Sequence, residues 1–455
     1  PALPPSRDVE VRGVAGGGTH HVLAARELGR RLPPRAATQH VASVRGHLNP
    51  AFCCAFDRTG ERVATGSDDF NVKLWSSRTG VLQHVLRGHR GEITDLAISA
   101  DNTQLASASN DGTVRIWRLR DGAPIAVLGA PDIPLGHPNQ EWVANAVDFS
   151  RAAARPWLLC VAFANVSLWD PADYEKPPLR LRLPPPRWPP PSAGIDTAHP
   201  TYTGAAGWQG VPVATAAGMS DGPPPPLACG CGALDDTGNY AAVGAAGWPH
   251  LFMWPLHDAR AHLGGGDGGA PQRDSAGLAP VELRGHKAEV TTVAFSNRGD
   301  RLLSGSRDGT ARLWYWRGRL RSVAGVLLES PAAVAAVRRA REARDARPPA
   351  VRVNMVAWAC DDSRCFTAET LHKTTIAAPC LEAWVSVWHG RSGECLHTLP
   401  FAAAEPCYFL RASPVDAGVV ASAGYDSRLR LWNARTAALL GEFPVRDVRE
   451  DAEEE

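Results

Sequence analysis

The feature that most constrains the fold is a group of four residues that recurs at fixed spacing. His47, Thr65, Asp69 and Trp75 are separated by 18, 4 and 6 residues. Two further quartets have the same three spacings: His89, Ser107, Asp111 and Trp117, and His286, Ser304, Asp308 and Trp314. Three repetitions of three spacings are not expected by chance, so the sequence predicts an internal structural repeat.

Weaker copies of the unit share its outline. One copy near the C-terminus lacks the His but keeps Ser422, Asp426 and Trp432 at spacings of 4 and 6. Three more copies keep only the alternating apolar segments that end in a tryptophan, at Trp169, Trp254 and Trp388. The sequence therefore contains seven units.

The units have the pattern of antiparallel β-sheets. Each contains short segments of period-two alternation separated by turn residues, and another short segment such as VLQHVL follows the Trp. Four strands cannot bury both faces alone, so units must stack. A unit of about 40 residues with Gly-His and a terminal Trp is typical of the WD-repeat blade. We therefore expect an all-β WD-repeat β-propeller with seven recognisable four-stranded blades.

The quartets are predicted to be structural. In a WD-repeat blade the Asp holds the His, the His contacts the hydroxyl, and the hydroxyl reaches the indole N–H. A buried polar group without a partner costs about 1–3 kcal/mol, so the set must be complete. Ser, His and Asp also suggest a catalytic triad, but a triad needs an exposed base–hydroxyl pair beside an oxyanion site. A triad is also not expected three times at one register, so we expect no catalytic residue and no enzyme.

Composition argues against several other classes of function. The formal net charge of +1 offers no global field for nucleic acid or an anionic membrane. No run of 18 apolar residues exists, and the N-terminus lacks a secretory pattern. The 10 cysteines form no CxxC pair, which indicates free thiols in a reducing compartment rather than metal ligands. We expect no metal, cofactor or small-molecule substrate, and no direct binding of nucleic acid.

Composition also divides the chain into segments. We expect a mostly disordered N-terminal extension at residues 1–38 and a propeller at residues 39–446. An acidic tail is expected at residues 447–455. Three insertions interrupt the propeller. They are a Pro-rich segment (residues 171–227), a Gly-rich segment (259–280) and an exposed basic helix (330–349). The Pro- and Gly-rich insertions are expected to be extended or disordered. The basic helix is expected to be a solvated surface feature.

Ring closure raises a question about the number of blades. Propellers avoid an open edge by pairing an N-terminal strand with the last blade. Residues 39–44 resemble an outer strand, yet the segment after Trp432 already supplies one to the seventh unit. This favours an eight-bladed ring whose last three strands lie beyond residue 455, over a seven-bladed ring with one idle strand. The start at Pro1 rather than Met is consistent with a fragment.

Several segments are more specific than a generic WD repeat. They are HLNPAFCCAFDRTGERVATGSDDFNVKLWSSRTG, FSNRGDRLLSGSRDGTARLW, VNMVAWACDDSRCFTA and PVDAGVVASAGYDSRLRLWNARTAALLGEF. In this order they resemble the propeller of the bromodomain and WD-repeat family, over residues 41–446. The insertions depart from that pattern, and no bromodomain lies within the sequence.

This resemblance implies a chromatin-associated scaffold in the nucleus, with the cytoplasm as a second location. It implies roles in transcription and in cell shape and cytoskeletal organisation. It also implies service as a substrate receptor of cullin-four RING ubiquitin ligases, with the ligase adaptor and histones or chromatin proteins as partners. A histone-tail reader without a ligase role is the alternative, and fold alone does not decide between them.

In such receptors an Arg three residues after the blade Trp contacts the adaptor. Five arginines occupy that position here: Arg78, Arg120, Arg317, Arg391 and Arg435. Only Trp432–Asn433–Ala434–Arg435 also has the Asp or Asn that the receptor motif requires after Trp. A turn arginine can pair bidentately with a carboxylate of a partner, or it can simply be solvated.

Overall fold

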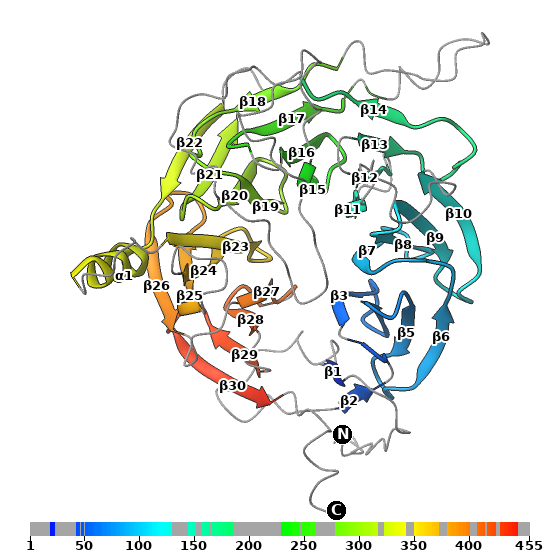
Figure 1. Cartoon of the computed structure of the whole chain (residues 1–455), viewed down its shortest axis with the longest axis horizontal. Helices are drawn as coiled ribbons and strands as arrows, with labels where there is room; N and C mark the ends of the chain where they lie inside the picture. Colours follow the sequence, from blue (N-terminus) through cyan, green and yellow to red (C-terminus); the bar gives the residue numbers. More distant parts are fainter. Residues whose placement is uncertain are drawn as a thin grey trace, which may run out of the picture.

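The computed structural model describes most of the seven units. The described residues are 19–22, 42–45, 47–49, 51–129, 144–151, 156–162, 165–184, 229–245, 248–257, 259, 278–316, 323–342, 350–372, 380–400, 407–414, 416–424 and 428–444. They form seven four-stranded antiparallel sheets arranged radially around a central axis (Figure 1), and one separate two-stranded sheet. The predicted seven-bladed, all-β propeller is therefore confirmed.

In the first four blades the strands follow chain order from the axis to the perimeter. Blade 1 comprises β3 (Ala51–Phe56), β4 (Arg62–Ser67), β5 (Val72–Ser76) and β6 (Leu82–Leu86). Blade 2 comprises β7 (Ile93–Ile98), β8 (Gln104–Ser109), β9 (Thr113–Arg118) and β10 (Pro124–Gly129). Blade 3 comprises β11 (Ala144–Phe149), β12 (Leu158–Ala162), β13 (Asn165–Trp169) and β14 (Leu179–Leu181). Blade 4 comprises β15 (Cys229–Leu234), β16 (Tyr240–Ala245), β17 (Leu251–Pro255) and β18 (Val281–Leu283).

The last three blades have the same topology. Blade 5 comprises β19 (Val290–Phe295), β20 (Arg301–Ser306), β21 (Ala311–Trp316) and β22 (Val323–Leu328). Blade 6 comprises β23 (Ala350–Trp358), β24 (Arg364–His372), β25 (Cys380–His389) and β26 (Cys395–Pro400). Blade 7 comprises β27 (Cys407–Ala412), β28 (Val419–Gly424), β29 (Arg428–Asn433) and β30 (Ala438–Pro444).

The hydrophobic core lies between neighbouring blades. The face of blade 1 that meets blade 2 contributes Ala64 and Leu74, which are fully buried. They pack against Ile93, Leu105 and Trp117 of blade 2, so the repeat Trp faces the preceding blade. Alternation along each strand therefore gives every sheet two apolar faces, which are buried mainly by the neighbouring sheets in the ring.

Side-chain hydrogen bonds also join the inner strands of successive blades. Thr94 of β7 donates its hydroxyl to the carbonyl of Ala144 at 2.6 Å. Thr291 of β19 donates to the carbonyl of Val353 at 2.6 Å. These bonds set the position of one sheet against the next near the axis, where strands of different blades approach most closely.

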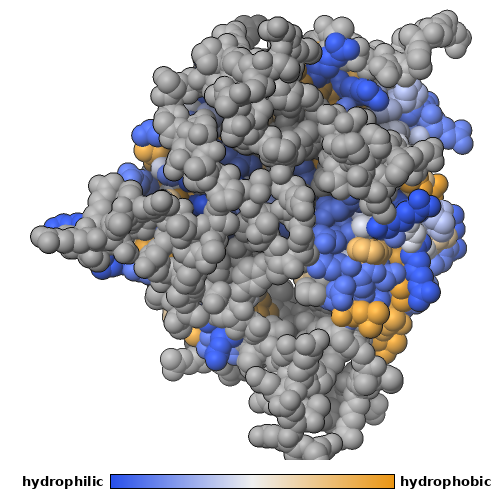
Figure 2. All heavy atoms as spheres, viewed as in Figure 1, coloured by the Kyte–Doolittle hydropathy of each residue, from blue (hydrophilic) through white to orange (hydrophobic). Residues whose placement is uncertain are grey.

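Apolar side chains remain partly exposed on the outermost strands. Leu82 of β6 and Ile125 and Val127 of β10 are 40–42% exposed. Figure 2 shows apolar surface on the corresponding side of the molecule. The outer strands of blades 1 and 2 therefore leave part of their apolar surface in contact with solvent.

The inserted helix lies within the expected range and buries one of its faces. Helix α1 spans Pro331–Glu342 and begins with proline at its first position, where the missing N–H is not needed. Ala333 and Ala336 are buried against Leu371 and Trp384 of blade 6, while Arg338 and Arg339 on the basic face are exposed. Within the described ranges, no helix is long and apolar enough to cross a membrane.

Two further strands lie in segments expected to be unstructured or inserted. β14, the outer strand of blade 3, lies inside the range 171–227, and β1 (Thr19–Val22) lies inside the range 1–38. β1 pairs antiparallel with β2 (Ala42–Arg45), which overlaps the expected outer strand at 39–44. β2 joins neither blade 7 nor blade 1. Most of the Pro-rich and Gly-rich insertions, and the acidic tail, lie outside the described residues.

A pair of leucine variants tests where the core lies. Leu74→Ala should lower the free energy of unfolding by about 2–5 kcal/mol, because it opens a cavity between blades 1 and 2. Leu82→Ala, on the same blade but 40% exposed, should cost less than about 1 kcal/mol. Urea unfolding followed by tryptophan fluorescence measures both changes, and equal losses would place the core elsewhere.

Candidate functional site

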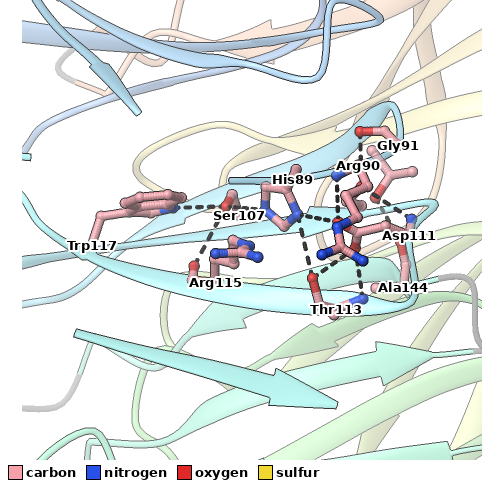
Figure 3. A network of polar contacts seen from close by, with 11 residues as sticks. His89, Arg90, Gly91, Ser107, Asp111, Thr113, Arg115, Trp117 and Ala144 are labelled. Atoms are coloured by element: carbon pink, nitrogen blue, oxygen red, sulfur yellow. Dashed lines mark hydrogen bonds and ion pairs between the residues drawn. The ribbon is translucent and has the colours of Figure 1, made fainter. Parts of the chain in front are cut away.

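The quartet of blade 2 forms one continuous chain of hydrogen bonds (Figure 3). Nδ1 of His89 lies 2.9 Å from Oδ2 of Asp111, and its Nε2 lies 2.7 Å from the hydroxyl of Ser107. The indole N–H of Trp117 donates to the same hydroxyl at 2.9 Å. Because the carboxylate of Asp111 can only accept, Nδ1 of His89 donates to it; in the neutral imidazole Nε2 then accepts from the O–H of Ser107, whose oxygen also accepts the indole N–H.

The other two complete quartets have the same geometry. In blade 1 the contacts of His47 with Asp69 and Thr65, and of Trp75 with Thr65, are each 2.8 Å. In blade 5 the corresponding contacts among His286, Asp308, Ser304 and Trp314 are 3.1, 2.8 and 2.8 Å. The three histidines and three hydroxyls are buried. This geometry offers no exposed nucleophile, and the chains connect the two ends of each sheet.

Each quartet aspartate also organises backbone turns. Oδ2 of Asp111 accepts the N–H of Arg90, and its Oδ1 accepts the N–H of Thr113. Burial alone would raise the pKa of Asp111, but the hydrogen bonds and charge from His89 and the hydroxyl of Thr113 lower it well below its ordinary value. In blade 5 the same balance lowers the pKa of Asp308 to about 2. Both carboxylates are therefore ionised at neutral pH.

The weaker units keep only parts of the chain. In blade 7 the indole of Trp432 donates to Ser422 at 2.8 Å, while Asp426 lies outside the described residues. In blade 3 Trp169 donates to the nearby Ser167 at 3.1 Å. In blade 4 the buried indole N–H of Trp254 has no acceptor among the described residues. Within the described residues, these three blades therefore show fewer links of the chain than blades 1, 2 and 5 do.

Blade 6 contains a substitute network that the sequence analysis missed. Trp388 donates to Thr367 at 2.9 Å, and the hydroxyl of Thr367 donates to Glu369 at 2.6 Å. Glu369 is 2% exposed and also accepts the indole N–H of Trp384 at 2.6 Å. Burial raises the pKa of Glu369 although these hydrogen bonds oppose the shift. The carboxylate thus takes the place of the missing histidine, and only its position two residues after Thr367 could have signalled it.

A cation two residues before the Trp is a second element that the sequence analysis missed. The position carries Lys73, Arg115, Arg312 and Arg430 in blades 1, 2, 5 and 7. Lys73 lies 3.6 Å from Asp69, and Arg430, buried to 2% exposure, lies 2.9 Å from Glu442 of the next strand. A Cβ on Gly285 would come within 2.5 Å of Arg312, so Gly precedes His because the guanidinium fills that space. The spacing is visible in VKLW, VRIW, ARLW and LRLW.

The turn that carries Arg435 lies at the opposite end of the third strand from the quartet aspartates. Oδ1 of Asn433 accepts the N–H groups of Arg435 at 2.8 Å and Thr436 at 3.2 Å. His397 of blade 6 donates to the carbonyl of Arg435 at 2.9 Å. The side chain of Arg435 is exposed and passes over Gly418, where a Cβ would come within 3.1 Å of its Nε. The turn is therefore rigid while the guanidinium is accessible.

The other arginines at this position differ in their surroundings. Arg78 lies 3.5 Å from Glu61, and Arg120 lies 3.8 Å from Asp121. Arg391 is exposed, and Arg317 lies outside the described residues. Blades 3 and 4 carry Ala172 and His257 at the equivalent position. The arginines consequently occur in adjacent blades, from blade 5 through blades 6 and 7 to blades 1 and 2.

Nothing in the described part of the chain resembles a metal centre. No group of three or more His, Cys, Asp or Glu side chains is placed to hold an ion there. The described cysteines are free thiols. The candidate functional surface is therefore the rim that carries Arg435, and the quartets stiffen the sheets behind it.

Comparisons with known proteins agree with this architecture. The WD domain, G-beta repeat model matches residues 38–76, 80–118 and 280–315, so the chain carries WD40 repeats. This fold is generally a non-catalytic scaffold for protein interactions. The chain is 51% identical over 59 residues to a bromodomain and WD repeat-containing protein of Dictyostelium discoideum, which is 13% of this chain and 3% of that protein. It is 34% identical over 63 residues to the nuclear distribution protein PAC1 of Coccidioides posadasii, covering 14% and 13%.

The matched segments are thus a small part of both relatives. The first similarity is consistent with the WD-repeat portion of the bromodomain and WD-repeat family. Two solved structures share the fold at a TM-score of 0.52. One is the β-propeller domain of Cps50 (Swd1) of Myceliophteria thermophila, 16% identical over 84% of this chain and 96% of that one. The other is the computationally designed Ika8 protein, 18% identical over 88% of each chain.

Removing the hydroxyl of one quartet should test the role of the chain. Ser107→Ala leaves His89 and Trp117 without their shared partner, and should lower the free energy of unfolding by about 1–3 kcal/mol. Ser167→Ala is the matched control, because among the described residues that half-buried serine has a side-chain hydrogen bond with Trp169 alone, and it should cost less than about 1 kcal/mol. Urea denaturation compares them, and an unchanged Ser107→Ala protein would contradict the structural role.

Acid titration should reveal the lowered pKa of Asp308. A carboxylate whose pKa is about 2 when folded and about 3.9 when unfolded stabilises the fold above pH 4, and loses this contribution as the pH falls through 2. The stability difference between wild type and Asp308→Asn should therefore shrink by about 2 kcal/mol between about pH 5 and pH 2. Asp300→Asn, at an exposed aspartate, is the control. A pH-independent difference for Asp308→Asn would show that its pKa is not lowered.

Proposed function

We propose that this propeller is a non-catalytic substrate receptor of a cullin-RING ubiquitin ligase, acting in the nucleus on chromatin-associated proteins. The WD40 repeats and the segment that is 51% identical to a bromodomain and WD repeat-containing protein support a role of this kind. The family resemblance also suggests effects on transcription and on cell shape. In this proposal one rim binds the ligase adaptor, and the other surfaces remain available for the substrate.

The observation that carries the proposal is the turn at Arg435. Its backbone is held by Asn433 within the turn and by His397 from the neighbouring blade. A guanidinium presented from a rigid turn loses little conformational entropy when it forms a bidentate pair with a carboxylate. Asn433 and Arg435 are also the pair of residues that the receptor motif requires after the blade Trp.

The neighbouring blades would extend this contact along the rim. Arg391 is exposed on blade 6, next to blade 7. Arg78 and Arg120 already have acidic neighbours in Glu61 and Asp121. If Arg78 or Arg120 left its own acidic neighbour to pair with a carboxylate of the adaptor, the binding free energy would improve little, because a surface ion pair contributes only about 0–1 kcal/mol. Arg435 is therefore the expected centre of the contact, with Arg391 second.

The alternative function, a histone-tail reader that uses the central channel, has weaker support. Asp95 of β7 and Asp148 of β11 are carboxylates on inner strands. Asp95 accepts the backbone N–H of Val147, and Asp148 accepts that of Leu234. Burial raises their pKa values to about 6 and about 7, so near neutral pH Asp148 is only partly ionised while Asp95 stays largely ionised. They join adjacent blades and are poorly suited to attract a lysine side chain.

Substitution of Arg435 tests the proposal. In a pull-down with purified adaptor, Arg435→Ala should lower binding at least about tenfold, the effect expected for a central arginine of an interface. Arg435→Lys should restore part of it, because the charge remains but the bidentate geometry is lost. Arg90→Ala, an exposed arginine beside a quartet aspartate on the opposite rim, is the control. Full adaptor binding by Arg435→Ala would refute the proposed contact.

A further inference from the structure

Blade 2 carries three arginines without a charged partner around its Gly-His pair. Arg87 and Arg90 flank Gly88 and His89 in the connection from β6 to β7, and both are exposed. Arg115, on β9, is half-buried. Among the described residues, none of the three guanidinium groups forms a hydrogen bond or an ion pair. These three arginines are therefore an unneutralised group of cations on the rim of the quartet aspartates.

The guanidinium of Arg115 lies against Gly88. A Cβ on Gly88 would come within 2.6 Å of Nη1 of Arg115, so this side chain occupies the space that the glycine leaves. Figure 3 shows Arg90 and Arg115 beside His89. Because Cα atoms of neighbouring residues are about 3.8 Å apart, Arg87 and Arg90 begin one and two residues from this contact. The three long side chains are thus close enough to reach a single anion.

The carboxylates near these arginines already have partners. Oδ2 of Asp111 lies 2.9 Å from Nδ1 of His89, and Oε2 of Glu92 accepts the side-chain N–H of Asn110 at 2.8 Å. Nε of Arg115 is buried and has no hydrogen-bond acceptor among the described residues. A buried donor without an acceptor costs free energy. Arg115 would therefore be stabilised by an anion supplied by another molecule.

The corresponding cations of blades 1 and 5 have partners within the chain. In blade 1 Lys73, at the position of Arg115, lies 3.6 Å from Asp69. In blade 5 Arg284, at the position of Arg87, lies 2.7 Å from Glu282. The repeat thus supplies a cation beside the Gly-His pair, and blade 2 differs because both this cation and the flanking Arg87 are free.

An apolar surface adjoins the three arginines. Arg115 is directly opposite Val127 of β10 in the antiparallel pair, so both side chains lie on the same face of the sheet. Val127 is 42% exposed, and Ile125 on the same strand is 41% exposed. β10 is also the outermost strand of its sheet. A ligand bound here would meet positive charge and apolar side chains together.

We propose that Arg87, Arg90 and Arg115 bind a phosphorylated serine or threonine of a partner protein, and that Val127 contacts an apolar side chain next to it. A phosphate monoester carries about −1.5 to −2 charges at pH 7 and three acceptor oxygens, so it can pair with several guanidinium groups at once. A partner carboxylate has a single charge, and such pairs at a surface contribute little to binding.

The surroundings of the three arginines favour a phosphopeptide over other phosphate ligands. Free phosphate would leave Val127 and Ile125 uncovered. A nucleic acid would need an extended positive field, which a net charge of +1 does not provide. These arginines lie on the rim opposite Arg435, so this proposal does not depend on the ligase proposal.

Peptide binding to the purified chain tests the proposal. The probe is a fluorescein-labelled peptide library with a central phosphoserine and random residues on both sides, and fluorescence anisotropy measures its binding. The library should bind at least about tenfold more tightly than the same library with serine at the centre. Arg115→Lys should weaken binding about tenfold, because bidentate pairing is lost. This variant should retain the fold, since Lys73 occupies the same position in blade 1.

Matched double variants locate the binding to blade 2. Arg87→Ala combined with Arg90→Ala removes two exposed cations and should weaken binding at least about tenfold. Arg284→Ala combined with Lys287→Ala removes their exposed counterparts on blade 5 and should change binding less than about twofold.

Three results would overturn the proposal. The first is equal binding of the phosphoserine and serine libraries. The second is an equal loss of binding in the two double variants, which would show a general effect of charge. The third is displacement of the library by inorganic phosphate or by a single-stranded oligonucleotide at the concentration at which unlabelled phosphopeptide displaces it, because the ligand would then not be a peptide.

Discussion

The structure depends on the burial of apolar sheet faces between neighbouring blades. Each blade is a four-stranded sheet whose side chains alternate between two faces, and both faces are apolar, as Leu74 and Trp75 show on β5. A single sheet can bury neither face in water, so the sheets must surround an axis and cover one another. Stability is consequently spread over many equivalent interfaces, and no single core supports the whole ring.

Most polar side chains in these interfaces are buried together with hydrogen-bond partners, although Trp254 of blade 4 shows an exception. In blades 1, 2 and 5 the set is His, hydroxyl, Asp and Trp, and in blade 6 Glu369 replaces the His with other donors around it. In blade 7 Arg430 is buried and pairs with Glu442. Different residues thus satisfy the same requirement, because a buried donor or acceptor without a partner costs more free energy than the hydrogen bond contributes.

Because the interfaces and quartets stabilise the sheets from within, the turns at the rims remain available to bind partners. The quartet aspartates close turns at one end of the sheets, while the arginines after the Trp lie in turns at the other end. The turn of Arg435 is held by Asn433 and by the adjacent blade, so it presents its charge from a fixed backbone. A rigid scaffold with exposed turn residues suits recognition of other proteins, and buried Ser, His and Asp side chains do not suit catalysis.

The amino-acid sequence by itself determined the fold, the number of complete blades and the members of the quartets. Fixed spacing and period-two alternation are local properties, and they specify which side chains share a sheet face. The roles of Glu369 and Arg430 could not be read in this way, because their partners Trp384 and Glu442 become neighbours only through strand pairing. The buried face of α1 was likewise decided by the tertiary structure. Packing between segments that are distant in the chain determines which apolar and polar groups are buried. The local sequence pattern does not contain that information.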